Sequence, residues 1–170
     1  MRFFRLKRGM INISDQGVNM AIIFTVVGIV AAIGYNVYSK FWALNETNTV
    51  SNIINEMRNM GEGNGGYGTS NYNQALINSE AISSKVRYSG TTIYNHGGGT
   101  ITVVGANTGF TVTSTALSKK DCINLASQLG TSDMSSTKIN STSLSGTVST
   151  SEATAACSSD SNTVAFTTKG

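Results

Sequence analysis

The chain has 170 residues, a net charge of +3 and only 12% charged residues, which suits one domain of modest size. Residues 1–17 carry four of the 12 Lys and Arg residues but only one of the 9 Asp and Glu residues, so the rest of the chain is neutral. Because the net positive charge is confined to this N-terminal segment, it indicates membrane topology and argues against a nucleic-acid-binding surface.

An uncharged and mostly apolar run extends from Val18 to Tyr38, which is 21 residues. About 20 such residues span the core of a bilayer as a helix. A basic segment before the span is typical of the cytoplasmic side, so we expect residues 40–170 to be translocated. A cleaved secretory signal fits less well, because the apolar run is too long and no small-residue cleavage site precedes Lys40.

The helix is predicted to continue past the apolar run, from about Asn19 to Met60, with Gly61 as its stop signal. Apolar side chains recur at three- and four-residue steps in its second half, which is typical of a helix that packs one face on a domain. They are Tyr38, Trp42, Val50, Ile53, Ile54, Met57 and Met60. The opposite, polar face is predicted to hold Glu46, Asn48, Asn52, Asn55 and Arg58. Gly28 and Gly34 fit either close packing between apolar helices or a weak point at which the helix melts.

Residues 61–99 give weaker signals. The glycine-rich loop 61–70 does not resemble a phosphate cradle, because no Lys-Ser or Lys-Thr follows it. A short helix is predicted over residues 73–84. The only histidine, His96, precedes three glycines and is expected at a loop tip. Since no nucleophile or acid stands at a defined spacing from it, and the acids are scattered singly, we expect no enzyme, no cofactor and no metal site.

The clearest strand pattern is a hairpin. Residues 100–104 and 110–115 each alternate apolar and polar side chains around the turn residues 105–109. The inward-facing pair is expected to be Ile101 with Val103, or Phe110 with Val112. Residues 163–167 alternate in the same way and are predicted to form the last strand, with Val164 and Phe166 on one side.

A second helix is predicted after Ser118, which forms a capping box with Asp121. Its buried face is expected to carry Cys122, Leu125, Ala126 and Leu129, and Gly130 ends it. Residues 131–150 are rich in Ser and Thr and show little periodicity. A short turn is expected from Ser151 to Cys157.

Both cysteines, Cys122 and Cys157, lie in the part predicted to be translocated. An even number of cysteines in an exported domain favours a disulfide over two free buried thiols. Closing a loop of about 36 residues stabilises the fold by roughly 4 kcal/mol in the chain-entropy account. The disulfide would join the second helix to the end of the segment 131–156. Asn45 and Asn140 begin Asn-x-Thr and Asn-x-Ser/Thr patterns, which are frequent by chance in so polar a chain.

The order of these features resembles a type IV pilin, and most closely the type IVb pilins such as the bundle-forming and toxin-coregulated pilins. A basic leader, a glycine and a long apolar helix come first, and the only two cysteines lie in the last third. The segments that carry the resemblance at the C-terminal end are Phe110–Thr113, Leu117–Cys122, Glu152–Cys157 and Asn162–Phe166. The resemblance implies an α+β fold in which the helix 18–60 packs on an antiparallel sheet within a head domain, 61–170.

The resemblance further implies that prepilin peptidase removes the basic leader, residues 1–17, after a glycine, and that the new N-terminus is methylated. Cleavage between Gly17 and Val18 is favoured over cleavage between Gly9 and Met10, because it places the apolar run first. The subunit would wait in the bacterial inner membrane until an assembly platform and its ATPase extract it into a surface pilus for adhesion, aggregation or conjugation. The filament core would be built from Val18, Met20, Ile22, Ile23, Phe24, Val26, Val27, Gly28, Ile29, Val30, Ile33 and Gly34.

One position departs from the family pattern. The fifth residue of a mature pilin is usually Glu, but here it is Ile22 after cleavage at Gly17, or Ser14 after cleavage at Gly9. An N-terminal amine buried without a partner in an apolar bundle is costly. The departure keeps two alternatives open: a minor pilin, and a membrane-anchored adhesin or binding domain that does not polymerise.

Overall fold

We analysed a computed structural model, which describes residues 46–61, 65–80, 82 and 86–170. The chain divides into Met1–Lys40 and Phe41–Gly170, and all described residues belong to the second unit. The predicted leader, both candidate cleavage sites and the apolar run 18–38 lie outside the described residues. Among the helices that are described, none has the length and hydrophobicity needed to cross a bilayer.

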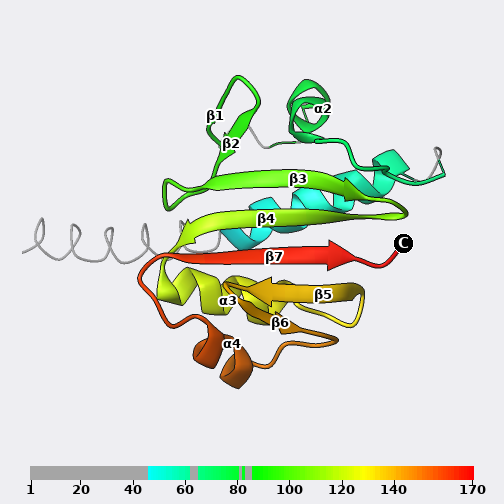
Figure 1. Ribbon diagram of the computed structural model, residues 1–170. Helices are drawn as coiled ribbons and strands as arrows, with labels where there is room; N and C mark the ends of the chain where they lie inside the picture. Colours follow the sequence, from blue (N-terminus) through cyan, green and yellow to red (C-terminus); the bar gives the residue numbers. More distant parts are fainter. Residues whose placement is uncertain (1–45, 62–64, 81, 83–85) are drawn as a thin grey trace, which may run out of the picture. The chain divides into compact units, whose positions relative to one another are not determined.

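The centre of the unit is one antiparallel sheet of seven strands in the order β1-β2-β3-β4-β7-β5-β6 (Figure 1). The strands are β1 (Tyr88–Ser89), β2 (Thr92–Tyr94), β3 (Thr100–Ala106), β4 (Gly109–Leu117), β5 (Met134–Ile139), β6 (Thr142–Leu144) and β7 (Asn162–Thr168). The last strand, β7, lies between β4 and β5, so the two halves of the sheet are joined by the C-terminal segment. The predicted α+β class with an antiparallel sheet is confirmed.

The predicted hairpin is present and is longer than its periodicity indicated. β3 and β4 pair from Ala106–Gly109 to Ile101–Ser114, so the connecting turn is only Asn107 and Thr108. The two alternatives for the inward face are both realised, because Val103 and Val112 are direct partners and both are fully buried. Val164 and Phe166 of β7 lie on the same buried face, as predicted.

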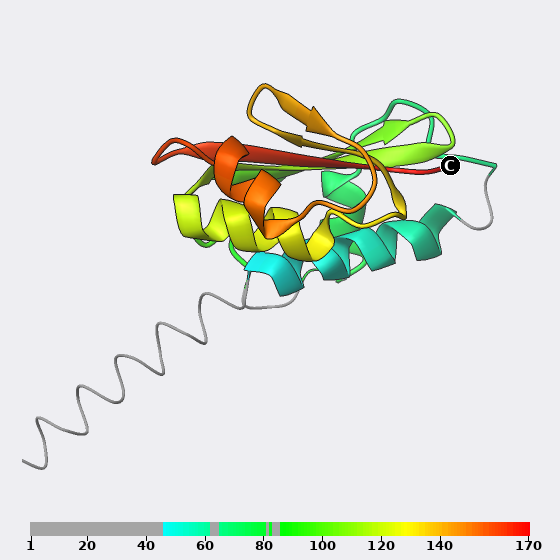
Figure 2. The ribbon, with the colours of Figure 1, turned by 90° about the horizontal axis from the view of Figure 1, so that it is seen from below.

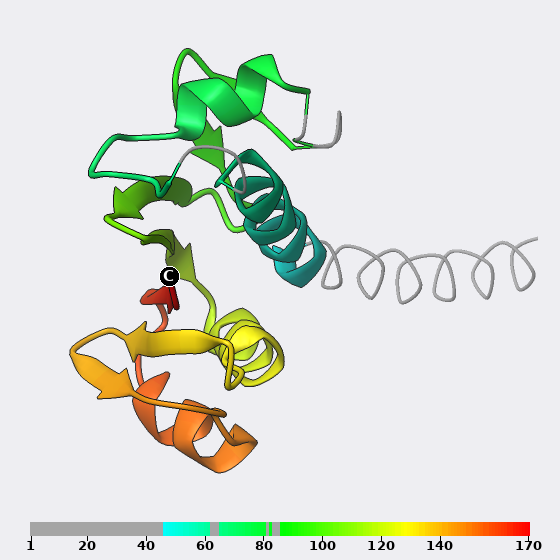
Figure 3. The same ribbon diagram turned by 90° about the vertical axis from the view of Figure 1, so that its right-hand side faces the viewer.

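The helix 46–61 and α3 (Lys119–Leu129) cover one face of this sheet (Figures 2 and 3). The helix α2 (Asn73–Asn78) contacts β3, and α4 (Thr150–Ala156) packs on α3. Figures 2 and 3 agree that the helix 46–61 and α3 lie side by side against this face. The described part of the apolar stripe predicted for the helix 46–61 is confirmed, because Val50, Ile53, Ile54 and Met57 are at most 4% exposed and Met60 is partly buried. Tyr38 and Trp42 lie outside the described residues.

Several elements differ from the sequence-based expectation. The helix predicted over residues 73–84 is only six residues long and ends at Asn78. Strands β1 and β2 were not predicted, and neither were β5 and β6, which occupy the Ser/Thr-rich segment 131–150. The expected turn before Cys157 is a helix, α4, opened by a capping box between Ser149 and Glu152.

Candidate functional site

A disulfide joins Cys122 and Cys157, as predicted. Their Cα atoms are 6.0 Å apart, and both residues are fully buried. Cys122 lies in the first turn of α3 and Cys157 caps the C-terminus of α4. The bond therefore ties two helices together and encloses the segment that contains β5 and β6.

Side-chain caps fix the two helices that carry the cysteines. The backbone N–H of Asp121 donates to Ser118 Oγ at 3.1 Å, which caps α3 so that its first residue, Lys119, lies three positions before Cys122. At α4, the backbone N–H of Ser149 donates to Glu152 at 2.8 Å, and hydrogen bonds from Ser149 lower the pKa of that carboxyl group. Each cap satisfies backbone donors that the first turn leaves unpaired. The helix starts, and with them the cysteine positions, are thus set locally.

The helix 46–61 is attached to the sheet by a buried carboxylate, that of Glu46. This side chain is 5% exposed, although the sequence placed it on the polar face of the helix. Ser114 Oγ of β4 donates to Glu46 Oε1 at 2.8 Å, and the backbone N–H of His96 donates to Oε2 at 3.1 Å. The prediction was wrong because a carboxylate that receives two hydrogen bonds is tolerated in the interior, and both donors come from distant parts of the sequence.

Burial dominates the electrostatics of Glu46. It raises the pKa of the carboxyl group above the ordinary value of 4.5, and the hydrogen bonds from Ser114 and His96 oppose this shift. Asp121 adds a further upward contribution by charge repulsion, and the His96 side chain adds a downward one. Glu46 is thus a buried acid whose neutral form is favoured more than in water.

The loop 95–99 is held in place around this carboxylate. Asn95 Nδ2 donates to Ser114 Oγ at 3.0 Å, and Asn95 Oδ1 accepts from the backbone N–H of Gly99 at 2.7 Å. Asn95 is 2% exposed. His96 is exposed, as expected for a loop tip, and it is the backbone N–H of this residue that contacts Glu46. The sequence could not predict that His96 donates to Glu46, because every residue except proline has a backbone N–H and the residue type therefore carries no signal.

Replacing Gly99 with alanine is expected to lower the free energy of unfolding by about 2 kcal/mol, because the added Cβ overlaps the carbonyl group of Thr115. Chemical denaturation of the variant and the wild type measures the loss. Gly97→Ala is the matched control in the same loop, because its Cβ would lie 3.1 Å from the nearest atom, the carbonyl oxygen of Ala116. Equal losses in the two variants would contradict the proposed close packing at Gly99.

Other predicted site residues are placed as follows. Gly17, Val18, Gly9 and Met10, together with the proposed filament-core residues from Val18 to Gly34, lie outside the described residues. Asn45 does as well. Asn140 is described, and its Nδ2 atom donates to the carbonyl oxygen of Ala156 and to Asn162 Oδ1, both at 3.0 Å. Its side-chain amide is therefore engaged within the fold and poorly placed for glycosylation. Within the described part of the chain, no group of three His, Cys, Asp or Glu residues could hold a metal ion.

Comparison with known proteins assigns the chain to a family. The family model for the PilS N-terminal domain matches residues 42–169, which include every described element of the head. No curated protein and no solved structure matches the chain. The match covers most of the 170 residues and coincides with the disulfide-closed unit that carries the buried Glu46. The chain therefore belongs to the PilS N-terminal family and is a type IV pilus-associated protein.

Proposed function

We propose that this protein is a structural subunit of a bacterial type IVb pilus, with no enzymatic activity. The observation that carries the proposal is the packing of the helix 46–61 on a disulfide-closed head, in a chain whose sequence has an uncharged run over 18–38 before that helix. Such a chain would have an apolar helix for assembly and a folded domain for the surface.

In this proposal the apolar helices form the filament core and the heads lie outside. Before assembly, lipid surrounds the run 18–38 in the inner membrane. Lipid tails are as apolar as the helix itself, so exchange of lipid for copies of the helix is governed by packing, to which small residues contribute. Gly28 and Gly34 would allow close approach of neighbouring helices. Prepilin peptidase, the assembly platform and its ATPase are the expected partners.

The attachment of the helix 46–61 suits this role. An extraction force applied to the N-terminal part of the chain would reach the head through this helix. Val50, Ile53 and Met57 anchor it by burial, and Glu46 adds hydrogen bonds to β4 and to the loop 95–99. The head would therefore move with the helix as one body when the subunit leaves the membrane.

The test is the intact mass and N-terminal sequence of the protein in material sheared from the cell surface. A chain that begins at Val18, with or without one added methyl group, is the expected result. A chain that begins at Met10 would support the filament role but move the cleavage site. A full-length chain confined to membranes would favour the non-polymerising anchored domain, to which Ile22 at the fifth mature position also points.

Matched glycine variants separate the two cleavage sites. Gly17→Val is expected to leave the leader attached, to abolish filaments and to retain the protein in the membrane fraction. Gly9→Val is the control and is expected to be processed and assembled like the wild type. The reverse pattern would assign the cleavage to Gly9.

A further inference from the structure

The outward side of the helix 46–61 carries a row of asparagines. They follow one another at steps of four, three and four residues, which places them on one side of an α-helix, and all of them are exposed. The members of this asparagine stripe are Asn48, Asn52, Asn55 and Asn59. At 3.6 residues per turn the stripe lies opposite the buried Val50 and Met57. Figure 2 shows the helix on the outside of the head, on the side away from the sheet.

The described head gives no reason for asparagine at these positions. None of the four side chains forms a hydrogen bond with any residue in the described ranges. Asparagine is a weak helix former, because its amide competes for backbone hydrogen bonds. A helix face that meets only water is better served by Lys, Glu, Gln or Arg. Every asparagine between residues 45 and 59 nevertheless falls on this one side of the helix. The stripe therefore calls for a partner outside the described head.

The spacing of the stripe indicates what kind of partner it suits. Asn45 lies three residues before Asn48, and the same alternation of three and four residues leads back to Phe41, Tyr38 and Gly34. A repeat of seven residues with these steps is the pattern by which helices of neighbouring chains pack along a shared axis. Gly34 is one of the residues proposed for the filament core. The stripe is thus continuous in sequence with the proposed assembly surface.

The chemistry of the amide suits a contact between identical chains. Its NH₂ group donates and its carbonyl oxygen accepts, so two copies of the same side chain can hydrogen-bond to each other. A buried asparagine on the seam of a coiled coil fixes the register and the number of chains, at some cost in stability. A stripe of amides would therefore define how far one subunit is displaced along its neighbour.

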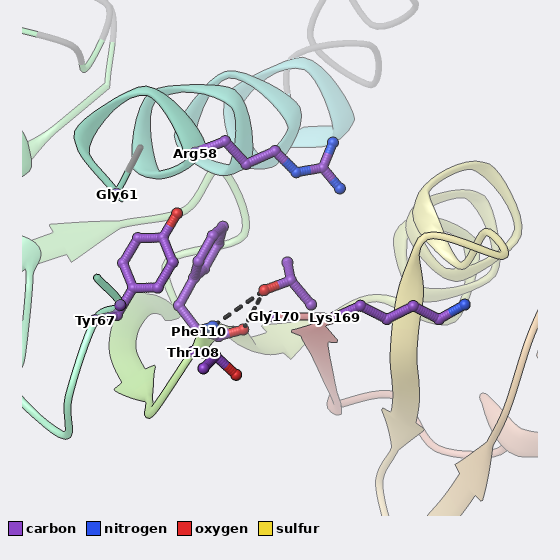
Figure 4. A pocket seen from close by; sticks show the side chains of 9 residues that line it. Arg58, Gly61, Tyr67, Thr108, Phe110, Lys169 and Gly170 are labelled. Atoms are coloured by element: carbon purple, nitrogen blue, oxygen red, sulfur yellow. Dashed lines mark hydrogen bonds between the residues drawn. The ribbon is translucent and has the colours of Figure 1, made fainter. Parts of the chain in front are cut away.

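The two flanks of the stripe carry opposite charges. Glu56 lies on one flank and Arg58 on the other, and neither forms an ion pair with a residue that the structure describes. Figure 4 shows the Arg58 side chain extending away from Tyr67 and Phe110, so it is not directed at these rings. Parallel copies arranged around an axis, with their stripes facing inward, would bring the acidic flank of one copy beside the basic flank of the next. This charge pattern favours a further copy of the chain as the partner.

We propose that the asparagine stripe is a contact surface between copies of this chain. The stripes of neighbouring subunits would face one another along the filament axis and hydrogen-bond through their amides. The inference rests on the proposed function, because it requires parallel copies held together in a filament. It gives the polar second half of the helix a task of its own, which is to set the register of the subunits that the apolar first half holds together.

The test is made on the full-length chain in cells, with Asn52→Asp and Asn55→Asp combined. In the assembled stripe the added carboxylates would face those of the neighbours, and like charges across an interface oppose association. The amount of protein in filaments sheared from the cell surface is expected to fall by about tenfold or more. The denaturation midpoint of the purified variant should stay close to that of the wild type, because both positions are exposed.

Opposite charges supply a rescue. Asn52→Lys combined with Asn55→Lys should lose filaments in the same way when it is expressed alone. Co-expression of the aspartate and lysine variants should raise the filament yield by about tenfold over either variant alone, since copies of opposite charge can then face each other. A folding defect in either variant would not be repaired by the other.

Asn71→Asp combined with Asn78→Asp is the matched control. Both asparagines are exposed, lie outside the helix 46–61 and use Oδ1 as a hydrogen-bond acceptor, which aspartate retains. This variant should assemble like the wild type. Normal filaments from the stripe variant, an equal loss in the control, or no recovery on co-expression would each overturn the contact between stripes and leave the proposed function standing. Absence of the wild-type chain from sheared filaments would overturn the proposed function, and this inference with it.

Discussion

Replacing both Cys122 and Cys157 with alanine is expected to lower the free energy of unfolding by about 4 kcal/mol. The two residues are 35 positions apart, and the chain-entropy account gives about 3 kcal/mol for a 15-residue loop and about 4.7 for a 100-residue loop. Domains of this size are stable by only about 5–15 kcal/mol, so the loss removes a large share of the total. Denaturant titration of the purified chain measures it, and the yield of surface filaments should fall in parallel.

The control for this prediction is reduction of the wild type. A reductant should shift the denaturation midpoint of the wild type toward that of the double variant and leave the double variant unchanged. Cys122→Ser alone is expected to be worse than the alanine pair, since it leaves one free thiol and adds a hydroxyl group at a fully buried position. It should abolish stable export. A normal filament yield from Cys122→Ser would contradict the structural importance of the bond.

Elements with strong local signals were predicted well from the sequence. The hairpin β3–β4 and the strand β7 have a two-residue alternation with one fully buried face, which is also what their pairing requires. Helix α3 carries its own start signal in Ser118 and Asp121, and the cysteine on its buried face follows from that start. These elements could be recognised because the residues that specify each one lie within about ten positions of one another.

The strands in the segment 131–150 could not be recognised, and the reason is physical. The pairing of β5 with β7 shifts register between Met134 and Ser136, which interrupts the alternation that would identify a strand. Of the two side chains of β5 that are buried beyond the shift, Thr137 is polar and only Ile139 is apolar, and β6 has only three residues. This half of the sheet is therefore specified by pairing with β7, a segment more than twenty residues away in the sequence.

The burial of Glu46 could not be predicted from the neighbouring sequence for the same reason, because its partners are distant in the chain. Its hydrogen-bond donors are 50 and 68 residues away in the sequence. A charged residue on an amphipathic helix is usually solvated, and nothing within one helical turn indicates otherwise. The candidate disulfide, in contrast, followed from the number and placement of the cysteines.

Replacing Glu46 with leucine is expected to lower the free energy of unfolding by about 4 kcal/mol. The substitution leaves the Ser114 hydroxyl and the backbone N–H of His96 without their acceptor, and each unsatisfied buried group costs about 1–3 kcal/mol. Leucine is a good helix former, so the helix itself is retained. Asn55→Leu, an exposed position on the same helix, is the matched control and should change stability by less than about 0.5 kcal/mol.

Replacing Glu46 with glutamine is expected to cost less stability at neutral pH than replacing it with leucine. The carbonyl oxygen of the amide can accept from the backbone N–H of His96, and its NH₂ group can donate to Ser114 Oγ, so only the hydroxyl proton of Ser114 loses its acceptor. Burial raises the pKa of Glu46 above 4.5, so the folded state holds the proton more tightly than the unfolded state does. The stability from this group is complete below about pH 4.5 and is lost as pH rises through the raised pKa.

The wild type should therefore gain stability as pH falls from neutral toward 4.5, relative to Glu46→Gln, which carries no titrating group there. Denaturant titrations of both proteins across this range measure the difference, and the comparison cancels contributions from acids that do not interact with Glu46. The glutamine variant should lose less stability than Glu46→Leu at neutral pH, because it keeps the acceptor for the backbone N–H of His96. If it instead lost as much stability as Glu46→Leu, the carboxylate would be needed in its charged form, and the attachment of the helix to β4 would depend on charge.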